Sequence, residues 1–209
     1  KKLKIFITSI DTNVGKTIAS SVLCSGLNYS YWKPIQCGDL DQSDSFTVNK
    51  LSPSTYIHPE AYKLKLPMSP HEAGFQEEVE IKLKNIELPE KKRIIIEGAG
   101  GVMVPLNYKG DLMVDMVKKL NARVMVIFKN YLGSINHTIL TIEQLKSYGL
   151  CVIGSIVIGD RVESSENIIQ SITNTKIIGH IPYCDNLDAQ WVAKQGEMMA
   201  KNLSKELKL

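Results

Sequence analysis

Short runs of apolar, largely β-branched residues recur along the chain, and segments of helical character separate them. The apolarity of these runs is continuous rather than alternating, which is typical of strands covered on both faces, as in parallel sheets. The predicted strands span residues 3–9, 30–35, 93–98, 123–128, 151–158 and 176–182. The predicted helices span residues 16–28, 71–86, 111–121, 135–148, 162–173 and 188–207. This order predicts a doubly wound α/β fold in which helices flank a mostly parallel sheet.

Two segments fall outside this pattern. Residues 37–70 and 87–92 are irregular, and long loops on a rigid sheet often carry function. No internal repeat or linker interrupts the alternation, so residues 1–209 are interpreted as a single domain. In doubly wound sheets ligands gather beyond the carboxyl ends of the strands. Polar residues at strand ends are therefore the candidates for a functional site.

The composition agrees with a globular domain and excludes several other classes of protein. The chain has 209 residues, of which 44% are hydrophobic and 22% charged, and its net charge is +3. This charge is mild and scattered, so we expect no nucleic-acid partner. No apolar run reaches the roughly 18 residues needed to cross a bilayer, so we expect no membrane partner. The four cysteines show no metal-ligand spacing and suit a reducing cytoplasm, where we expect a soluble protein; they are Cys24, Cys37, Cys151 and Cys184.

The stretch SIDTNVGKT, residues 9–17, ends like a Walker A phosphate-binding loop. Gly15, Lys16 and Thr17 match the second half of the motif, but Ser9 and Ile10 stand where an opening glycine would be. The stretch follows a predicted strand and opens a predicted helix, which is the context that the motif requires. Lys16 would then reach the β- and γ-phosphates, and Thr17 would bind Mg²⁺, as in P-loop NTPases. The alternative is a strand-to-helix turn in which Lys16 is merely solvated.

A magnesium site also needs carboxylates. Glu97 ends the predicted strand at 93–98 and precedes small residues that let a phosphate come close. Asp44 is a second candidate, although the residues alone favour a turn or helix N-terminal aspartate.

Together with further motifs, these residues resemble those of the dethiobiotin synthetases. The phosphate loop of that family reads roughly G-T-D-T-x-V-G-K-T, and residues 9–17 match it with Ser9 in place of the first glycine. The other matches, in the order of the family, are WKPIQCG at 32–38, Ser43-Asp44, MSPH at 68–71, IEGAGG at 96–101 and LGSINH at 132–137.

The resemblance implies a reaction and the residues that carry it. ATP, CO₂ and 7,8-diaminopelargonic acid would give dethiobiotin, ADP and phosphate through a carbamate and a carbamic-phosphoric anhydride. Lys16 and Lys33 would be catalytic, and Thr17, Asp44 and Glu97 would share the Mg²⁺.

The resemblance also assigns the binding residues. Substrate would be bound by Thr12, Lys33 and Cys37, and, across a homodimer, by Gly133, Ser134, Ile135 and Asn136 of the other subunit. The nucleotide would be bound by Asn13, Val14, Gly15, Lys16, Thr17, Asp44, Glu97, Gly98, Ala99, Gly100, Gly159, Asp160, Pro182, Tyr183 and Cys184. His137 is interpreted as a packed or capping residue rather than a catalytic one.

Three departures from the family pattern bear on specificity. Ser9 replaces a glycine, and Cys37 stands where serine is common, so a hydroxyl donor becomes a weak thiol donor. Gly159 stands where the family usually has an asparagine that reads the adenine edge. A glycine offers no side-chain amide, so we expect weaker or broader base recognition, with nucleoside triphosphates other than ATP accepted.

Three other functions fit the sequence less well. Partitioning and maturation NTPases, which act as switches, usually carry an extra early lysine, as in K-G-G-x-G-K, and this loop has none. A glutamine-dependent amidoligase would need an added amidotransferase domain, for which 209 residues leave no room. A non-enzymatic nucleotide-binding protein would not need the whole set of Lys16, Thr17, Lys33, Asp44 and Glu97.

Overall fold

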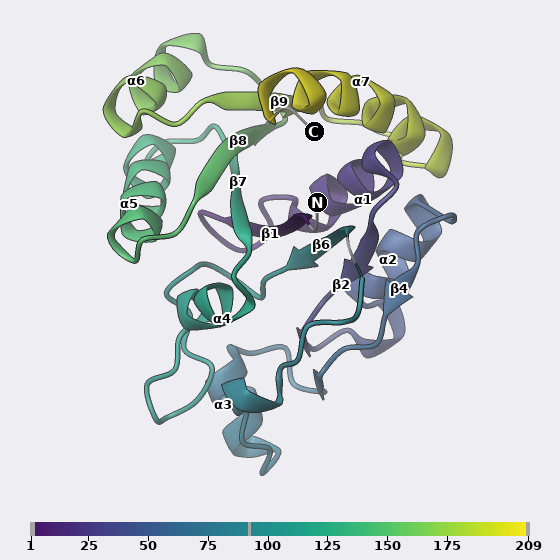
Figure 1. Cartoon of the computed structure of the whole chain (residues 1–209), viewed down its shortest axis with the longest axis vertical. Coiled ribbons are helices and arrows are strands. Elements are labelled where there is room, and N and C mark those ends of the chain that lie inside the picture. Colours follow the sequence, from purple (N-terminus) through teal and green to yellow (C-terminus); the bar gives the residue numbers. More distant parts are fainter. Residues whose placement is uncertain (1–2, 92, 208–209) are drawn as a thin grey trace.

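A seven-stranded parallel sheet forms the centre of the molecule (Figure 1). The structure is a computed structural model that describes residues 3–91 and 93–207. The strands lie in the order β4-β2-β6-β1-β7-β8-β9. Their bounds are β1 Leu3–Ser9, β2 Ser30–Trp32, β4 Ile57–His58, β6 Arg93–Glu97, β7 Arg123–Lys129, β8 Val152–Ile158 and β9 Ile177–Ile181. A small second sheet pairs β3 (Ile35–Cys37) with β5 (Tyr62–Leu64).

Helices cover both faces of the large sheet. On one face lie α1 (Lys16–Leu27), α2 (Asp44–Leu51) and α7 (Ala189–Leu207), and on the other lie α4 (Met113–Leu120), α5 (Ser134–Ser147) and α6 (Glu163–Thr173) (Figure 1). The short helix α3 (Pro70–Gln76) and the 3₁₀ turns η1 (Leu40–Gln42) and η2 (Leu83–Asn85) belong to the connections.

The two faces of the sheet bury separate clusters of apolar side chains. Along β1, Ile5 and Ile7 point toward α1 and α7, whereas Phe6 points toward the helices of the opposite face. This alternation follows from the two-residue period of a strand, and it explains why a strand buried on both sides reads as a continuous apolar run. The predicted doubly wound, mostly parallel α/β fold is confirmed.

The prediction of one helix over 71–86 is wrong. Helix α3 ends at Gln76, and Glu78 adopts a φ of 57°, a left-handed conformation that a right-handed helix cannot contain. After this reversal only the short turn η2 forms within the predicted range.

The segment 37–70 is more ordered than its sequence indicates. It contains η1, α2, β4 and β5, and α2 begins where the Ser43 hydroxyl accepts a hydrogen bond from the Phe46 amide. Strands of two or three residues are too short to show a period, so the sequence gives no signal for them.

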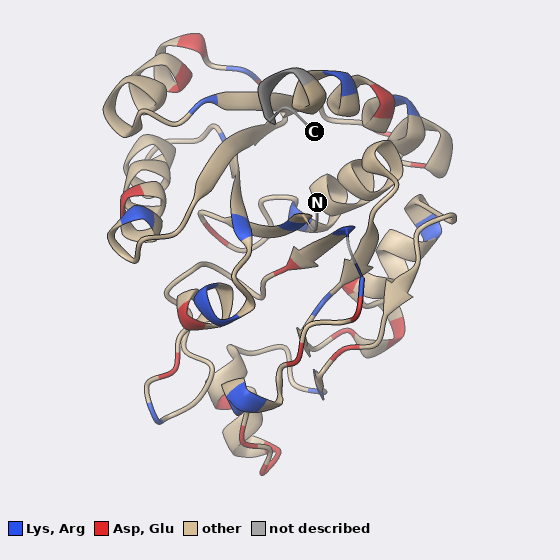
Figure 2. Ribbon diagram, viewed as in Figure 1, with Lys and Arg blue, Asp and Glu red and all other residues tan. Residues whose placement is uncertain are grey.

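Charged residues of both signs are interspersed over the helices and loops in the view of Figure 2. Among the described helices, none combines the length and the apolarity needed to cross a bilayer.

Candidate functional site

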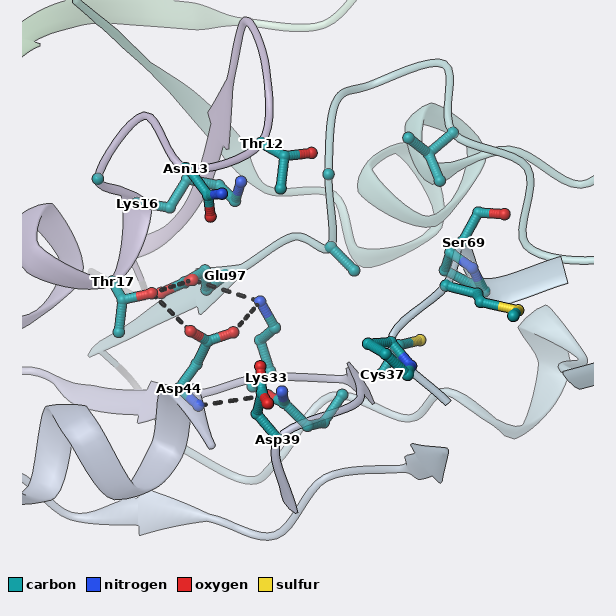
Figure 3. Close-up of a pocket in the computed structure, with 18 of the residues that line it drawn as sticks. Thr12, Asn13, Lys16, Thr17, Lys33, Cys37, Asp39, Asp44, Ser69 and Glu97 are labelled. Carbon is teal, nitrogen blue, oxygen red and sulfur yellow. Dashed lines mark hydrogen bonds and ion pairs between the residues drawn. The ribbon is translucent and has the colours of Figure 1, made fainter. Parts of the chain in front are cut away.

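The loop between β1 and α1 lies at the carboxyl end of the sheet, as the sequence predicts (Figure 3). Two of its residues have left-handed backbone, Asn13 with a φ of 57° and Gly15 with a φ of 105°. Asparagine and glycine tolerate this region best. A Cβ on Gly15 would also stand 3.3 Å from the side chain of Ile158, at the end of β8, so the loop turns tightly against the sheet there.

Lys16 begins α1 and is almost fully buried. Its Nζ donates a hydrogen bond to the Ser9 Oγ at 3.0 Å, and the Ser9 hydroxyl in turn donates to the Asp11 carbonyl at 2.5 Å. Burial lowers the pKa of Lys16, and the nearby Glu97 carboxylate opposes that shift only in part. Ser9 is thus a hydrogen-bond partner of the loop lysine.

The two candidate carboxylates come from elements far apart in the sequence and meet at Thr17. Glu97 ends β6 and Asp44 begins α2. The Thr17 Oγ1 donates to the Asp44 Oδ1 at 2.7 Å and lies 3.0 Å from the Glu97 Oε1. The structure therefore brings together the hydroxyl and both carboxylates that the sequence singled out (Figure 3).

Lys33 lies between the same carboxylates. Its Nζ is 2.6 Å from the Asp44 Oδ2 and 3.3 Å from the Glu97 Oε1, and it donates to the Gly98 carbonyl at 3.0 Å. Burial alone would lower the pKa of Lys33, but the charges of Glu97 and Asp44 outweigh it and the pKa is raised. Likewise burial would raise the pKa of Asp44, but Lys33 lowers it below its ordinary value. Both shifts of pKa favour the charged forms of Lys33 and Asp44.

Two buried hydroxyls that the sequence analysis did not single out position Glu97. Ser20 donates to the Glu97 Oε2 at 2.7 Å, and the Tyr31 hydroxyl donates to the same oxygen at 3.0 Å. Both residues are fully buried. The spacing in the sequence could have indicated both residues. Tyr31 lies two residues before Lys33 along an extended segment, and Ser20 lies three residues after Thr17 in a helix, so each pair points to the same side.

These groups border a cleft of about 670 Å³. The residues named from the sequence that line it are Thr12, Asn13, Gly15, Lys16, Thr17, Lys33, Cys37, Asp44, Glu97, Ala99 and Gly100. The rest of its wall is formed by residues not named as site residues, which are Ile18, Gln36, Asp39, Pro67, Met68, Ser69, Pro70 and Val104. Segment 67–70 closes the side of the cleft that bears Cys37 (Figure 3).

Other residues named from the sequence lie outside the lining of this cleft. Val14 is buried in the core beneath the loop, and the backbone of Gly98 packs against Phe6. Gly133, with a φ of 103°, precedes α5, and Ser134, Ile135 and Asn136 form the first turn of that helix.

The remaining candidates follow the last two strands of the sheet. Gly159 and Asp160 follow β8, and Pro182, Tyr183 and Cys184 follow β9. The Gly159 amide donates to the Ile181 carbonyl at 2.8 Å, so the two strand ends lie side by side. A Cβ on Gly159 would clash with the ring of Tyr183, which therefore fills the space above the glycine.

A divalent cation fits the chemistry of Thr17, Asp44 and Glu97. Among the described residues no cluster of three or more His, Cys, Asp or Glu side chains forms a metal cage. A hydroxyl and two carboxylates leave part of an octahedral coordination shell open, which suits Mg²⁺ that keeps waters and also binds phosphate oxygens. The residues present thus match a metal that arrives with a nucleotide.

Comparisons with known proteins identify the family of this chain. Residues 3–190 match the family model described as "AAA domain". The ATP-dependent dethiobiotin synthetase BioD of Christiangramia forsetii is 42% identical over 201 residues, which cover 95% of this chain and 96% of the relative. The protein of the same name from Cytophaga hutchinsonii is 46% identical over 182 residues, covering 85% of this chain and 87% of the relative.

Solved structures with a similar fold have low sequence identity to this chain. A ParA family ATPase from Chlorobium tepidum superposes with a TM-score of 0.60 at 14% identity, covering 99% of this chain and 100% of the other. The septum site-determining protein MinD of Pyrococcus horikoshii, complexed with Mg-ADP, has a TM-score of 0.57 at 16% identity and covers 99% of each chain. At such identities the likeness concerns the fold. The sequence relatives are far closer, and by them this chain belongs to the family of ATP-dependent dethiobiotin synthetases.

Proposed function

We propose that this protein makes dethiobiotin from 7,8-diaminopelargonic acid, CO₂ and ATP, as the sequence resemblance implies. One amine of the diamine captures CO₂ as a carbamate, and a carbamate oxygen attacks the γ-phosphorus while ADP leaves. The second amine then attacks the carbonyl carbon of the mixed anhydride, so that a ring closes and phosphate leaves. The observation that carries the proposal is the convergence of Lys16, Lys33, Thr17, Asp44 and Glu97 at one end of the cleft.

The protein's part in these steps is to position groups and to neutralise charge. Thr17, Asp44 and Glu97 would hold Mg²⁺, which supplies charge neutralisation for the phosphates when it is bound. Lys16 starts α1, where the helix N-terminus and the loop amides also favour phosphate oxygens. Lys16 and Lys33 are both almost fully buried, and in such surroundings a fixed positive charge stabilises developing negative charge better than it does in water.

The diamine end of the substrate is proposed to lie between Thr12 and Cys37, which border the cleft on different sides. Burial raises the pKa of Cys37 to about 11, so the group is a neutral thiol at physiological pH. Cys37 is therefore a weak hydrogen-bond donor there rather than a nucleophile.

A homodimer is proposed to complete the site through the start of α5. Leu132 is fully exposed just before that helix, and Ile135 and Leu140 are exposed along it. Exposed apolar residues on a helix support an interface, although each alone is common on protein surfaces. The amides of Gly133, Ser134, Ile135 and Asn136 would then bind the substrate carboxylate of the neighbouring subunit. The sequence-based interpretation of His137 as a packed or capping residue is not supported, because His137 is exposed and shares a hydrogen bond at 2.7 Å with the Tyr131 hydroxyl instead.

Base recognition is proposed to be broad. Nucleotide base contacts would come from the strand ends at Gly159, Asp160, Pro182, Tyr183 and Cys184. Gly159 has no side chain to read the base, and the exposed Tyr183 ring that lies over it offers a flat surface, which all bases can share. We further propose that the protein works in the cytoplasm on these small molecules.

The test is an assay of dethiobiotin by mass spectrometry with the diamine, bicarbonate and Mg²⁺, in which ATP, GTP and CTP are compared at equal concentration. Dethiobiotin with more than one nucleotide is the expected result. If dethiobiotin forms with ATP alone, the proposed reaction is supported and the proposal of broad base recognition is refuted. Nucleotide hydrolysis without dethiobiotin would refute the reaction and favour a switch ATPase.

A further inference from the structure

The ammonium of Lys33 has no free donor in this structure. It is in contact with the Asp44 Oδ2 at 2.6 Å, the Gly98 carbonyl at 3.0 Å and the Glu97 Oε1 at 3.3 Å. An ammonium has three N–H groups, so these three acceptors use all of them. Lys33 is 4% exposed, which leaves little room for solvent. In this arrangement Lys33 cannot also donate to a phosphate or a carbamate.

The oxygens that hold Lys33 are those that would hold a divalent cation. The same Glu97 Oε1 lies next to the Thr17 hydroxyl, and the other oxygen of Asp44 accepts the hydrogen of that hydroxyl (Figure 3). The second oxygen of Glu97 is taken by Ser20 and Tyr31. The carboxylates are therefore satisfied from within the chain, with Lys33 as their counter-ion.

We propose that Lys33 is an internal substitute for the divalent cation, which closes the metal site of the nucleotide-free protein and is displaced when the metal arrives with a nucleotide. This inference rests on the proposed function, in that Asp44 and Glu97 hold the metal there. Displacement frees the three N–H groups of Lys33, so the ammonium becomes available to phosphate and carbamate oxygens only once the metal is in place. Lys33 thereby couples metal binding to catalytic competence.

Elementary electrostatics explains why the exchange needs the nucleotide. A free divalent cation would share carboxylate oxygens with Lys33 at a few ångströms, where like charges repel strongly. Two carboxylates alone do not offset the free-energy cost of removing water from a free Mg²⁺ ion, which holds its waters tightly. Phosphate oxygens supply both further ligands and negative charge for the displaced ammonium, so the metal–nucleotide complex can displace Lys33 where the metal alone cannot.

Lys16 provides the matched control. It carries the same charge and is buried in the same cleft, but its Nζ donates to the Ser9 Oγ at 3.0 Å. Replacing Lys16 lowers the positive charge near the carboxylates by the same amount as replacing Lys33, and it vacates no carboxylate oxygen.

The experiment measures Mn²⁺ binding by electron paramagnetic resonance, with purified nucleotide-free protein and the metal alone as the probe. The variants are Lys33→Met, Lys33→Arg and Lys16→Met. We expect Mn²⁺ binding to be at least about tenfold tighter in Lys33→Met than in the wild type, because the competing cation is gone. Lys33→Arg keeps a cation and Lys16→Met keeps Lys33, so both should bind Mn²⁺ as weakly as the wild type. A non-hydrolysable ATP analogue should restore Mn²⁺ binding to the wild type.

Several results would overturn the inference. One is that the wild-type protein binds Mn²⁺ equally tightly with and without the nucleotide analogue. This comparison tests the inference even if Lys33→Met does not fold. Another is an equal gain of affinity in Lys16→Met and Lys33→Met, which would indicate a general effect of charge. Dethiobiotin synthesis is measured separately. Its absence, with the Mn²⁺ pattern intact, would refute the proposed function and leave the exchange at Lys33 standing.

Discussion

Glu97 is held by neighbours of different kinds on its two oxygens. Oε1 faces Thr17 and Lys33, and Oε2 accepts from Ser20 and Tyr31. The side that faces the cleft can exchange partners, whereas the side that faces the core keeps its hydroxyl donors. Buried hydroxyls of this kind fix the direction in which a carboxylate presents its free oxygen to a metal.

Tyr31→Phe should therefore weaken metal binding at the proposed site without unfolding the protein. Removing one donor leaves Oε2 bonded to Ser20, so we expect roughly three- to tenfold weaker Mn²⁺ binding in the presence of the ATP analogue, and a lower kcat. Tyr29→Phe is the control, since that ring lies next to Arg93 instead. Equal Mn²⁺ affinity in the two variants would contradict a positioning role for Tyr31.

At the scale of elements, β1, α1 and β6 could be predicted from the sequence, whereas helix α2, which carries Asp44, and the contacts between the elements could not. The apolar run that contains Ile5, Phe6 and Ile7 predicts a buried strand, and the Gly-Lys-Thr sequence at 15–17 predicts a phosphate loop after it. The approach of Asp44 to Lys33 depends on a short helix capped by Ser43, which has no periodic pattern. The contact of Tyr183 with Gly159 depends on the pairing of β8 with β9, in which Ile158 lies beside Ile181.

Helices α1 and α7 pack closely because each presents a glycine at their contact. A Cβ on Gly26 would clash with the carbonyl group of Gly196. We expect Gly26→Ala to lower the free energy of unfolding by about 2 kcal/mol, since overpacking outweighs the gain in helix propensity. Urea denaturation with Ser25→Ala as control measures this, and an unchanged or higher stability for Gly26→Ala would refute the close packing.

The start of α6 is stabilised by a buried carboxylate. Glu166 accepts hydrogen bonds from the Arg161 side chain and the Val162 amide. Burial would raise the pKa of Glu166, but these hydrogen bonds and the Arg161 charge outweigh it, so the pKa lies below its ordinary value of 4.5. A carboxyl with a lowered pKa in the folded state stabilises the protein above its ordinary pKa, and the stabilisation is lost as the pH falls through the folded-state value.

Glu166→Gln should accordingly cost about 1–2 kcal/mol of unfolding free energy at neutral pH. The difference from wild type should shrink as the pH falls from the ordinary carboxyl pKa of 4.5 through the lowered pKa of the folded state, below which the wild-type carboxyl is also protonated. Denaturant unfolding across this pH range, with the exposed Glu163→Gln on the same helix as control, gives the comparison. A difference that stays constant with pH would show that the charge of Glu166 contributes nothing.

At the scale of the whole molecule, the cleft lies at the carboxyl ends of β1, β2 and β6, while the start of α5 follows β7 at the same edge of the sheet. The start of α5 does not line the cleft of its own chain, although the resemblance assigns it to the substrate. A second subunit that brings its α5 over this cleft would place the start of that helix near the substrate.

Leu132→Asp should therefore produce a monomer. A charge at the centre of an apolar contact costs several kcal/mol of association free energy, so we expect the mass from light scattering to fall from about twice 23.3 kDa to 23.3 kDa. Met198→Asp on the exposed side of α7 is the control, because that helix covers the other face of the sheet. A wild-type protein that is already monomeric would contradict the shared site.

The most direct test of the proposed reaction follows the carbon of CO₂. Purified protein is given 7,8-diaminopelargonic acid, ¹³C-bicarbonate, Mg²⁺ and ATP, and dethiobiotin and ADP are quantified together, with Lys16→Met as the inactive reference. We expect dethiobiotin that carries the ¹³C label and one ADP for each molecule formed, both lost in Lys16→Met. ADP formed without labelled dethiobiotin would contradict it.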